Sequence, residues 1–307
     1  MKNKTVGGIM LLITTLIWGT AFVAQRQGAN YLGAFTFNGI RFLLGALVLL
    51  PFILLRNSRR PGRKAENGPK TQSGQTLLAA GVVTGVLVYI TVSLQQVGIA
   101  FTTAGKAGFV SVLYIVVVPV IGLFLGRHIP ARTWGCIALA TVGLYFLCMS
   151  EKLTLGFGDT LMLLSTVSTA VNILATDYYS TRVDCVKLSC LQLVICGAMS
   201  LATALLFEKP TMQAVLEAAG PILYTGVFSC GVAFTLKISA QKSVPPVATS
   251  LILSLQSVFA VLAGWLFLRE TLVVREAAGC ALMFVAIVLA QLPARKKTAS
   301  RKAEKVS

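Results

Sequence analysis

Ten long apolar runs constrain the fold of this chain more than any other feature of its sequence. They fall at residues 6–26, 33–55, 76–97, 103–126, 132–149, 158–179, 188–207, 218–238, 245–268 and 273–292. A helix that crosses the hydrocarbon core of a bilayer needs about 20 mainly apolar residues. Runs that are continuously apolar, without alternation of period two, favour helices over a β-barrel. The sequence therefore predicts an all-α polytopic membrane protein with ten transmembrane helices.

Composition excludes the soluble alternatives. Hydrophobic residues make up 56% of the 307 residues and charged residues only 12%, too few charges for the surface of a soluble domain of this length. The formal charge of +17 does not indicate a nucleic-acid partner, because the basic residues lie between apolar runs and in the C-terminal tail. The seven cysteines form no C-x-x-C pair and the chain has a single histidine, His128. We therefore expect neither a metal site nor any other cofactor.

The basic residues also predict the orientation. An even number of spans places both termini on one side of the membrane. Of the 27 Lys and Arg residues, 20 fall on that side, 5 on the opposite side and 2 within spans. Because basic residues are retained on the cytoplasmic side, the sequence predicts cytoplasmic N- and C-termini in the cell membrane. The tail, residues 293–307, is then a basic cytoplasmic segment.

A weak internal repeat divides the chain into residues 1–149 and 150–292. At an offset of 151, Trp18 corresponds to Thr169 and Gln25 to Thr176, and in the later spans the offset becomes 143, which aligns the two LFL tripeptides. Five spans per half would turn the second half upside down relative to the first. Inverted repeats are typical of transporters whose substrate site lies between the halves. The sequence thus predicts two inverted five-helix repeats.

Several segments resemble one family of membrane proteins. The first half contains LLITTLIWGTAFVAQ and GIRFLLGALVLLPFI, the fourth span AFTTAGKAGFVSVLYIVVVP, and the ninth span LQSVFAVLAGWLFLRE. In order and spacing these resemble the EamA-type transporters of the drug/metabolite transporter superfamily, over residues 7–292. The resemblance implies a fold of two inverted five-helix repeats and the export of amino acids or other small metabolites. Ser257 stands where the ninth-span pattern has proline, which does not affect the fold expectation.

Polar side chains inside the spans are the candidates for a substrate pathway. In the sixth span Ser165, Ser168, Thr169, Asn172 and Thr176 share one helical face. Such groups are costly in hydrocarbon unless they face protein or water. Packing between helices is the alternative for the hydroxyls. The candidate substrate-binding residues are Trp18, Gln25, Thr91, Gln95, Lys106, Thr169, Asn172, Thr176 and Gln256.

Charged residues refine this set. Lys106 and Arg41 lie within spans, where an ionisable group indicates a functional site by default, and both could attract a carboxylate or phosphate. Snorkelling to the interface is the alternative for Lys106, and a structural role is favoured for Arg41. Asp177, near the inner end of the sixth span, fits a solvated or ion-paired boundary charge. No carboxylate lies at mid-depth in a predicted span.

These features favour a transporter over the other classes. An intramembrane enzyme would need a nucleophile with a base, a metal cluster or paired acids, and the sequence has no H-E-x-x-H or G-x-S-x-G motif, so no enzymatic activity is expected. A flippase for lipids or isoprenoid carriers is the alternative function, but the polar helical faces inside the spans favour a small hydrophilic solute. We expect as partners the lipid bilayer and an amino acid or related metabolite, with the protein a monomer or homodimer.

Overall fold

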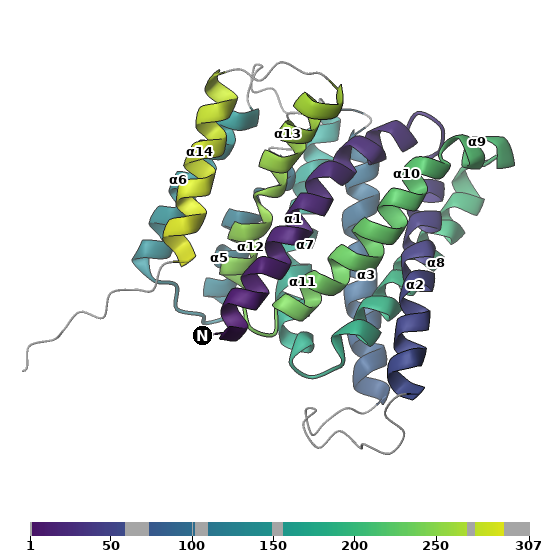
Figure 1. The fold of residues 1–307 in the computed structure, drawn as a ribbon, viewed down its shortest axis with the longest axis horizontal. Coiled ribbons are helices and arrows are strands. Elements are labelled where there is room, and N and C mark those ends of the chain that lie inside the picture. Colours follow the sequence, from purple (N-terminus) through teal and green to yellow (C-terminus); the bar gives the residue numbers. More distant parts are fainter. Residues whose placement is uncertain are drawn as a thin grey trace, which may run out of the picture.

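The computed structural model describes residues 2–58, 74–99, 101, 110–148, 156–268 and 274–291, and in that part of the chain helices are the only regular elements (Figure 1). The helices are α1 (Lys2–Gly28), α2 (Ala34–Ser58), α3 (Gly74–Ile99), α5 (Tyr114–Phe124), α6 (Ala131–Cys148), α7 (Phe157–Ser180), α8 (Cys185–Phe207), α9 (Met212–Glu217), α10 (Ala219–Tyr224), the π-helix η1 (Thr225–Ala233), α11 (Phe234–Ala240), α12 (Pro246–Leu253), α13 (Gln256–Leu268) and α14 (Val274–Gln291). The predicted all-α class is confirmed.

Seven helical stretches of the described chain are long and apolar enough to cross a membrane. They are Lys4–Gly28, Ala34–Leu55, Gly74–Ile99, Phe157–Ser180, Cys185–Phe207, Ala219–Ala240 and Pro246–Ala263. Tyr114–Phe124 and Ala277–Leu289 are shorter apolar helices. Helices overlap all ten predicted runs, although the count of ten spans stays a prediction.

Local sequence signals fix several helix starts. The Asp184 carboxylate accepts hydrogen bonds from the backbone N–H groups of Val186 and Lys187 at 3.0 and 3.1 Å, so it caps the first turn of α8. Pro246 occupies the first turn of α12, where a missing N–H costs nothing. Each start therefore follows from a residue whose chemistry suits a helix N-terminus.

The exterior of the bundle is apolar and its interior is unusually polar. Leu54, Phe124 and Leu205 are 64%, 87% and 79% exposed. Asn38, Gln192 and other amide and hydroxyl side chains are buried. A soluble domain distributes these residue types in the opposite way. The arrangement suits a protein whose outer surface faces lipid and whose polar groups face one another or a cavity.

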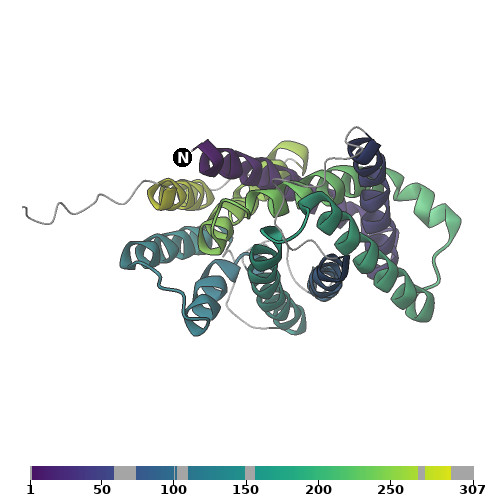
Figure 2. The same cartoon turned by 90° about the horizontal axis from the view of Figure 1, so that it is seen from below.

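Helix packing brings distant segments together. Helices α6 and α14 pair at one edge of the bundle, and α2 packs on α8 at the other (Figures 1 and 2). Between these pairs, α1 contacts η1, α11, α12 and α13, whereas α7 contacts α3 and α5. In α3, Gly81 and Gly85 lie directly against Leu191 and Ile195 of α8, because small residues four apart let two helices approach closely.

Helix α1 runs antiparallel to the stretch α10–η1–α11. The Thr20 hydroxyl lies 2.5 Å from the Tyr224 hydroxyl, and the Thr14 hydroxyl donates to the Ala233 carbonyl at 3.3 Å. Near its start, Gly7 lies beside Val244, beyond the end of α11. The beginning of α1 and the end of α11 therefore lie at the same end of the bundle.

Candidate functional site

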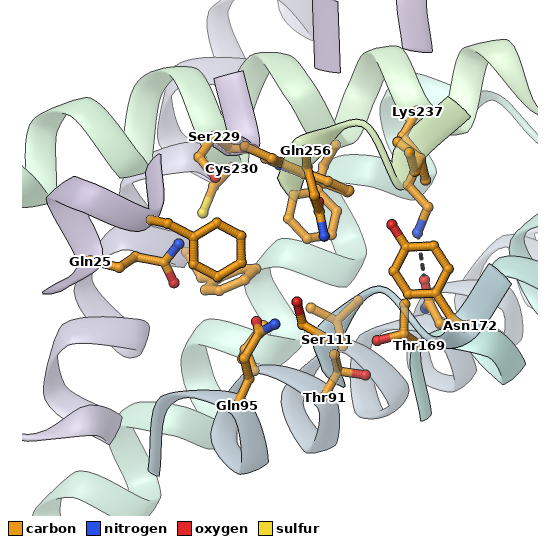
Figure 3. Close-up of a pocket in the computed structure, with 18 of the residues that line it drawn as sticks. Gln25, Thr91, Gln95, Ser111, Thr169, Asn172, Ser229, Cys230, Lys237 and Gln256 are labelled. Atoms are coloured by element: carbon orange, nitrogen blue, oxygen red, sulfur yellow. Dashed lines mark hydrogen bonds between the residues drawn. The ribbon is translucent and has the colours of Figure 1, made fainter. Parts of the chain in front are cut away.

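A cavity of about 100 Å³ lies in the polar interior (Figure 3). It is lined by Trp18, Phe22, Gln25, Arg41, Phe42, Val88, Thr91, Val92, Gln95, Ser111, Tyr114, Thr169, Asn172, Ile173, Ser229, Cys230, Phe234, Lys237, Leu253 and Gln256. These residues come from both halves of the chain. Because one water needs about 10–15 Å³ of such space, the cavity has room for several waters or one small solute.

Two interrupted helices border this cavity. Before α5, the N–H groups of Leu113 and Ile115 bond to carbonyls only three residues back, and the neighbouring Ser111 and Tyr114 line the cavity. Between α12 and α13, Leu255 and Ser257 make the same short bonds, beside the lining residue Gln256. Such 3₁₀ turns within helices often mark functional hinges.

The π-helix η1 supplies another wall. Its residues Ser229 and Cys230 line the cavity. Two side chains of α1 hold its backbone: Trp18 Nε1 donates to the Ser229 carbonyl at 3.2 Å, and Thr14 Oγ1 donates to the Ala233 carbonyl. The Trp18 indole also packs edge-on against Phe234, with centroids 5.1 Å apart. Trp18 therefore fixes the wall as well as lining the cavity.

Lys237 is the buried cation at one end of the cavity. Its side chain lies in α11 and the residue is only 4% exposed. Its Nζ donates to Asn172 Oδ1 at 2.7 Å, and Asn172 Nδ2 donates in turn to the Thr84 carbonyl of α3 at 3.2 Å. By its sequence position, Lys237 is one of the 20 basic residues expected on the cytoplasmic side, in a loop after the eighth span. That assignment is wrong, because α11 continues to Ala240 and turns this side chain inward.

Arg41 is the second cation in the lining, and it is 3% exposed. Its Nε donates to Asn38 Oδ1 at 3.1 Å, and its guanidinium carbon lies 5.4 and 5.1 Å from the ring centroids of Phe37 and Phe42. These contacts hold the side chain in place and fit the predicted structural role. Because Arg41 also lines the cavity, its charge acts on any solute there.

Several hydroxyl side chains of the polar helical faces make hydrogen bonds within or between helices. Thr91 Oγ1 donates to Ser168 Oγ at 2.9 Å, and Ser168 Oγ donates to the Leu87 carbonyl at 3.1 Å, so they link α3 to α7. Thr169 bonds to the Ser165 carbonyl of its own helix. Packing, the alternative interpretation of these hydroxyls, therefore accounts for part of the polar faces.

Asp177 pairs with Arg127 at 3.0 Å, with side chains 21% and 41% exposed, as predicted for a boundary charge. In the described part of the chain, no group of three His, Cys, Asp or Glu side chains is placed to hold a metal ion.

The structure brings most of the sequence candidates together. Seven line the cavity: Trp18, Gln25, Thr91, Gln95, Thr169, Asn172 and Gln256. Thr176 does not line it; its hydroxyl is buried without a hydrogen-bond partner among the described residues. Lys106 lies outside the described residues.

Several lining residues are not among the sequence candidates, chiefly Lys237, Tyr114 and Ser229. For Lys237 a signal was present, since an ionisable residue inside an apolar run indicates a functional site by default. Tyr114 lies beside the helix interruption and Ser229 in the π-helix, and neither feature is marked in the apolar runs of the sequence.

The chain has relatives among known membrane proteins. It is 27% identical to an uncharacterized transporter of Archaeoglobus fulgidus over 92% of this chain and 84% of the relative. It is 24% identical to the uncharacterized transporter YoaV of Bacillus subtilis, over 91% and 94%, and 24% identical to a WAT1-related chloroplastic protein of Arabidopsis thaliana, over 92% and 69%. A solved crystal structure shares the fold with a TM-score of 0.74 at 17% identity, over 93% and 96%.

A family model accounts for nearly the whole chain. The model of the EamA-like transporter family matches twice, over residues 5–149 and again over residues 156–292. The two matches together span both halves that line the cavity. Multi-pass helices with apolar exteriors agree with that assignment. The resemblance noted in the sequence is thereby confirmed, and the chain belongs to the EamA-like transporter family of membrane transporters.

Proposed function

We propose that this transporter exports a small hydrophilic metabolite, such as an amino acid or a related compound, across the cell membrane by alternating access through the central cavity. The observation that carries the proposal is the polar cavity itself, walled by side chains from both halves at two interrupted helices. Discontinuous helices that meet at a polar site between repeats are a common design in secondary transporters. The solute would bind among the amides and hydroxyls that line the cavity.

The proposed architecture is ten spans in two inverted repeats, residues 1–149 and 150–292, followed by the tail. The double family match supports it, as does the position of the two interruptions: Ser111 and Ser254 are related by the repeat offset of 143. Helix contacts also agree, because α1 contacts α11 and α13 much as α7 contacts α3 and α5. Two related halves could rock about the cavity and expose it to each side in turn.

Counterflow in proteoliposomes tests the transport. Vesicles containing the purified protein would be loaded with pooled amino acids and common metabolites, and the uptake of single labelled compounds measured with and without a pH gradient. We expect specific exchange of one solute class. Thr169→Trp should reduce it to the level of empty liposomes, because an indole at this position would fill the cavity. Thr160→Trp, at an exposed position of the same helix, is the matched control and should retain exchange.

Two results would contradict the proposal. One is the absence of exchange for every soluble compound in correctly folded protein. The other is equal exchange by the Thr169→Trp variant and the wild type, since transport would then bypass the cavity.

A further inference from the structure

The hydrogen bonds of Lys237 leave room for a ligand. An ammonium has three N–H donors, and the described residues offer Nζ one acceptor, Asn172 Oδ1 at 2.7 Å. That acceptor is neutral and is itself held in place by its bond to the Thr84 carbonyl. The side chain lines the cavity although the residue is 4% exposed. The remaining donors are therefore available to a molecule in the cavity.

The described charged side chains that line the cavity are all basic. Among the described residues that line the cavity, Arg41 and Lys237 carry basic groups and none carries a carboxylate. The carboxylate of Asp177, further along α7, is paired with Arg127. A buried ammonium is costly without a negative partner, and an anionic solute would supply one. A solute with an ammonium group would find no carboxylate here to receive it.

The two cations lie at different depths. A Cβ placed on Gly226 would lie 3.1 Å from the Arg41 carbonyl, so Arg41 is level with Gly226, eleven residues before Lys237 along the same stretch. At 1.5 Å per residue or less, the backbones of the two residues are at most roughly 17 Å apart along the bundle, and both side chains line the one cavity. Neutral amides, among them Gln25, Gln95 and Gln256, line the cavity as well (Figure 3). Arg41 is already held by Asn38 and two rings, whereas Lys237 has one hydrogen-bond acceptor among the described residues.

We propose that the transported solute is a small organic acid, an anion without a compensating ammonium group, whose carboxylate binds Lys237 Nζ. This inference rests on the proposed transport through the cavity and narrows its substrate class. Charge-assisted N–H···O hydrogen bonds from Lys237 hold the carboxylate, and Arg41 adds positive potential further along the cavity. The amides and the aromatic rings contact the rest of the molecule.

The test is counterflow with matched series of probes. One series is lactate, alanine and lactamide; the other is phenyllactate, phenylalanine and phenyllactamide. Within each series the shape is nearly constant while the molecule is an anion, a zwitterion or neutral. We expect exchange of the hydroxy acid in at least one series and little exchange of its amide. Lys237→Met should lower exchange of the acid at least about tenfold, since removing a buried charge partner costs more than 1.4 kcal/mol.

A second variant separates binding from folding. Asn172→Asp keeps the size of the side chain and replaces the 2.7 Å hydrogen bond by an ion pair, so a purely structural contact would be preserved. It neutralises Lys237, however, so we expect loss of acid exchange in a protein that melts at or above the wild-type temperature. Lys242→Gln, at an exposed position beyond α11, is the matched control and should exchange the acid normally.

The outcomes distinguish this inference from the proposed function. Exchange of alanine or phenylalanine but neither hydroxy acid, or unchanged acid exchange in Lys237→Met or Asn172→Asp, would overturn the organic-acid assignment and leave transport through the cavity intact. Exchange of other pooled metabolites but no probe of either series would do the same. The absence of exchange for every soluble compound would overturn both.

Discussion

At the scale of single residues, Glu208 shows how one carboxylate joins two distant helices. It follows α8, and its oxygens accept hydrogen bonds from the backbone N–H groups of Phe35 and Thr36 at 2.9 and 2.8 Å and from the Thr36 hydroxyl at 2.6 Å. These N–H groups belong to the first turn of α2, where backbone N–H groups have no acceptor within the helix. Gly33 permits this approach, because a Cβ there would lie 2.2 Å from the carboxyl carbon.

Replacing Glu208 by Gln should therefore destabilise the protein. The amide keeps only one acceptor oxygen, points an N–H₂ group at backbone donors and loses the charge that favours a helix N-terminus. We expect a loss of about 1–2 kcal/mol in stability, measured as a lower melting temperature in detergent. Glu217→Gln is the control, because that exposed carboxylate bonds, among the described residues, only to Gln213 of its own helix. Equal melting temperatures for the two variants would mean that the cap contributes nothing.

Residue periodicity predicted much of the cavity lining but not the buried charge of Lys237. Asn172 and Thr169 share a helical face with the other polar groups of their span, and a face that is polar in hydrocarbon must point inward. Thr176 continues the same face, yet it does not line the cavity. Lys237 was missed because it lies three residues before the end of α11, where counting along an apolar run cannot distinguish a loop from the last helical turn.

At the scale of helices, Gly19 sets the distance between α1 and the interrupted helix. A Cβ there would lie 2.5 Å from Phe259 Cβ and 2.8 Å from the Gln256 carbonyl oxygen. Backbone atoms cannot rotate away, so Gly19→Ala must push α13 outward, at a cost of about 1–3 kcal/mol. We expect reduced counterflow and a lower melting temperature. Gly8→Ala on the same helix meets nothing within 4 Å and should be neutral or stabilising; if Gly19→Ala behaves in the same way, this contact does not position α13.

The helix interruptions could not be predicted from the sequence. The turns at 112–113 and 254–255 contain neither glycine nor proline, the residues that usually signal a break. Their short hydrogen bonds occur inside continuous apolar runs, so packing rather than local preference sets them. The π-helix η1 could not be predicted from the sequence either, although it contains Gly226 and Gly231. Thr14 and Trp18, from the other half of the chain, bind its carbonyls.

At the scale of the whole molecule, the proposed inversion of the two halves has a direct geometric consequence. Gly7, near the start of α1, lies beside Val244, and the Cys185 thiol, at the start of α8, contacts the Ile238 carbonyl near the end of α11. The start of α1 and the turn between α7 and α8 are therefore at one end of the bundle. Helix α1 has 27 residues and is about 40 Å long, so its far end is at the opposite end.

Cysteine labelling at Asn30 and Thr181 tests this topology. Both are exposed, and the repeat offset of 151 relates them. In a variant without the seven natural cysteines, a membrane-impermeant maleimide should label Asn30→Cys in intact cells and Thr181→Cys only after permeabilisation, because the distribution of basic residues predicts cytoplasmic termini. Gln213→Cys, exposed on α9, should behave like Asn30→Cys. Labelling of Asn30→Cys and Thr181→Cys from the same side would refute inversion, whereas an exchange of the two patterns would preserve inversion and reverse the predicted orientation.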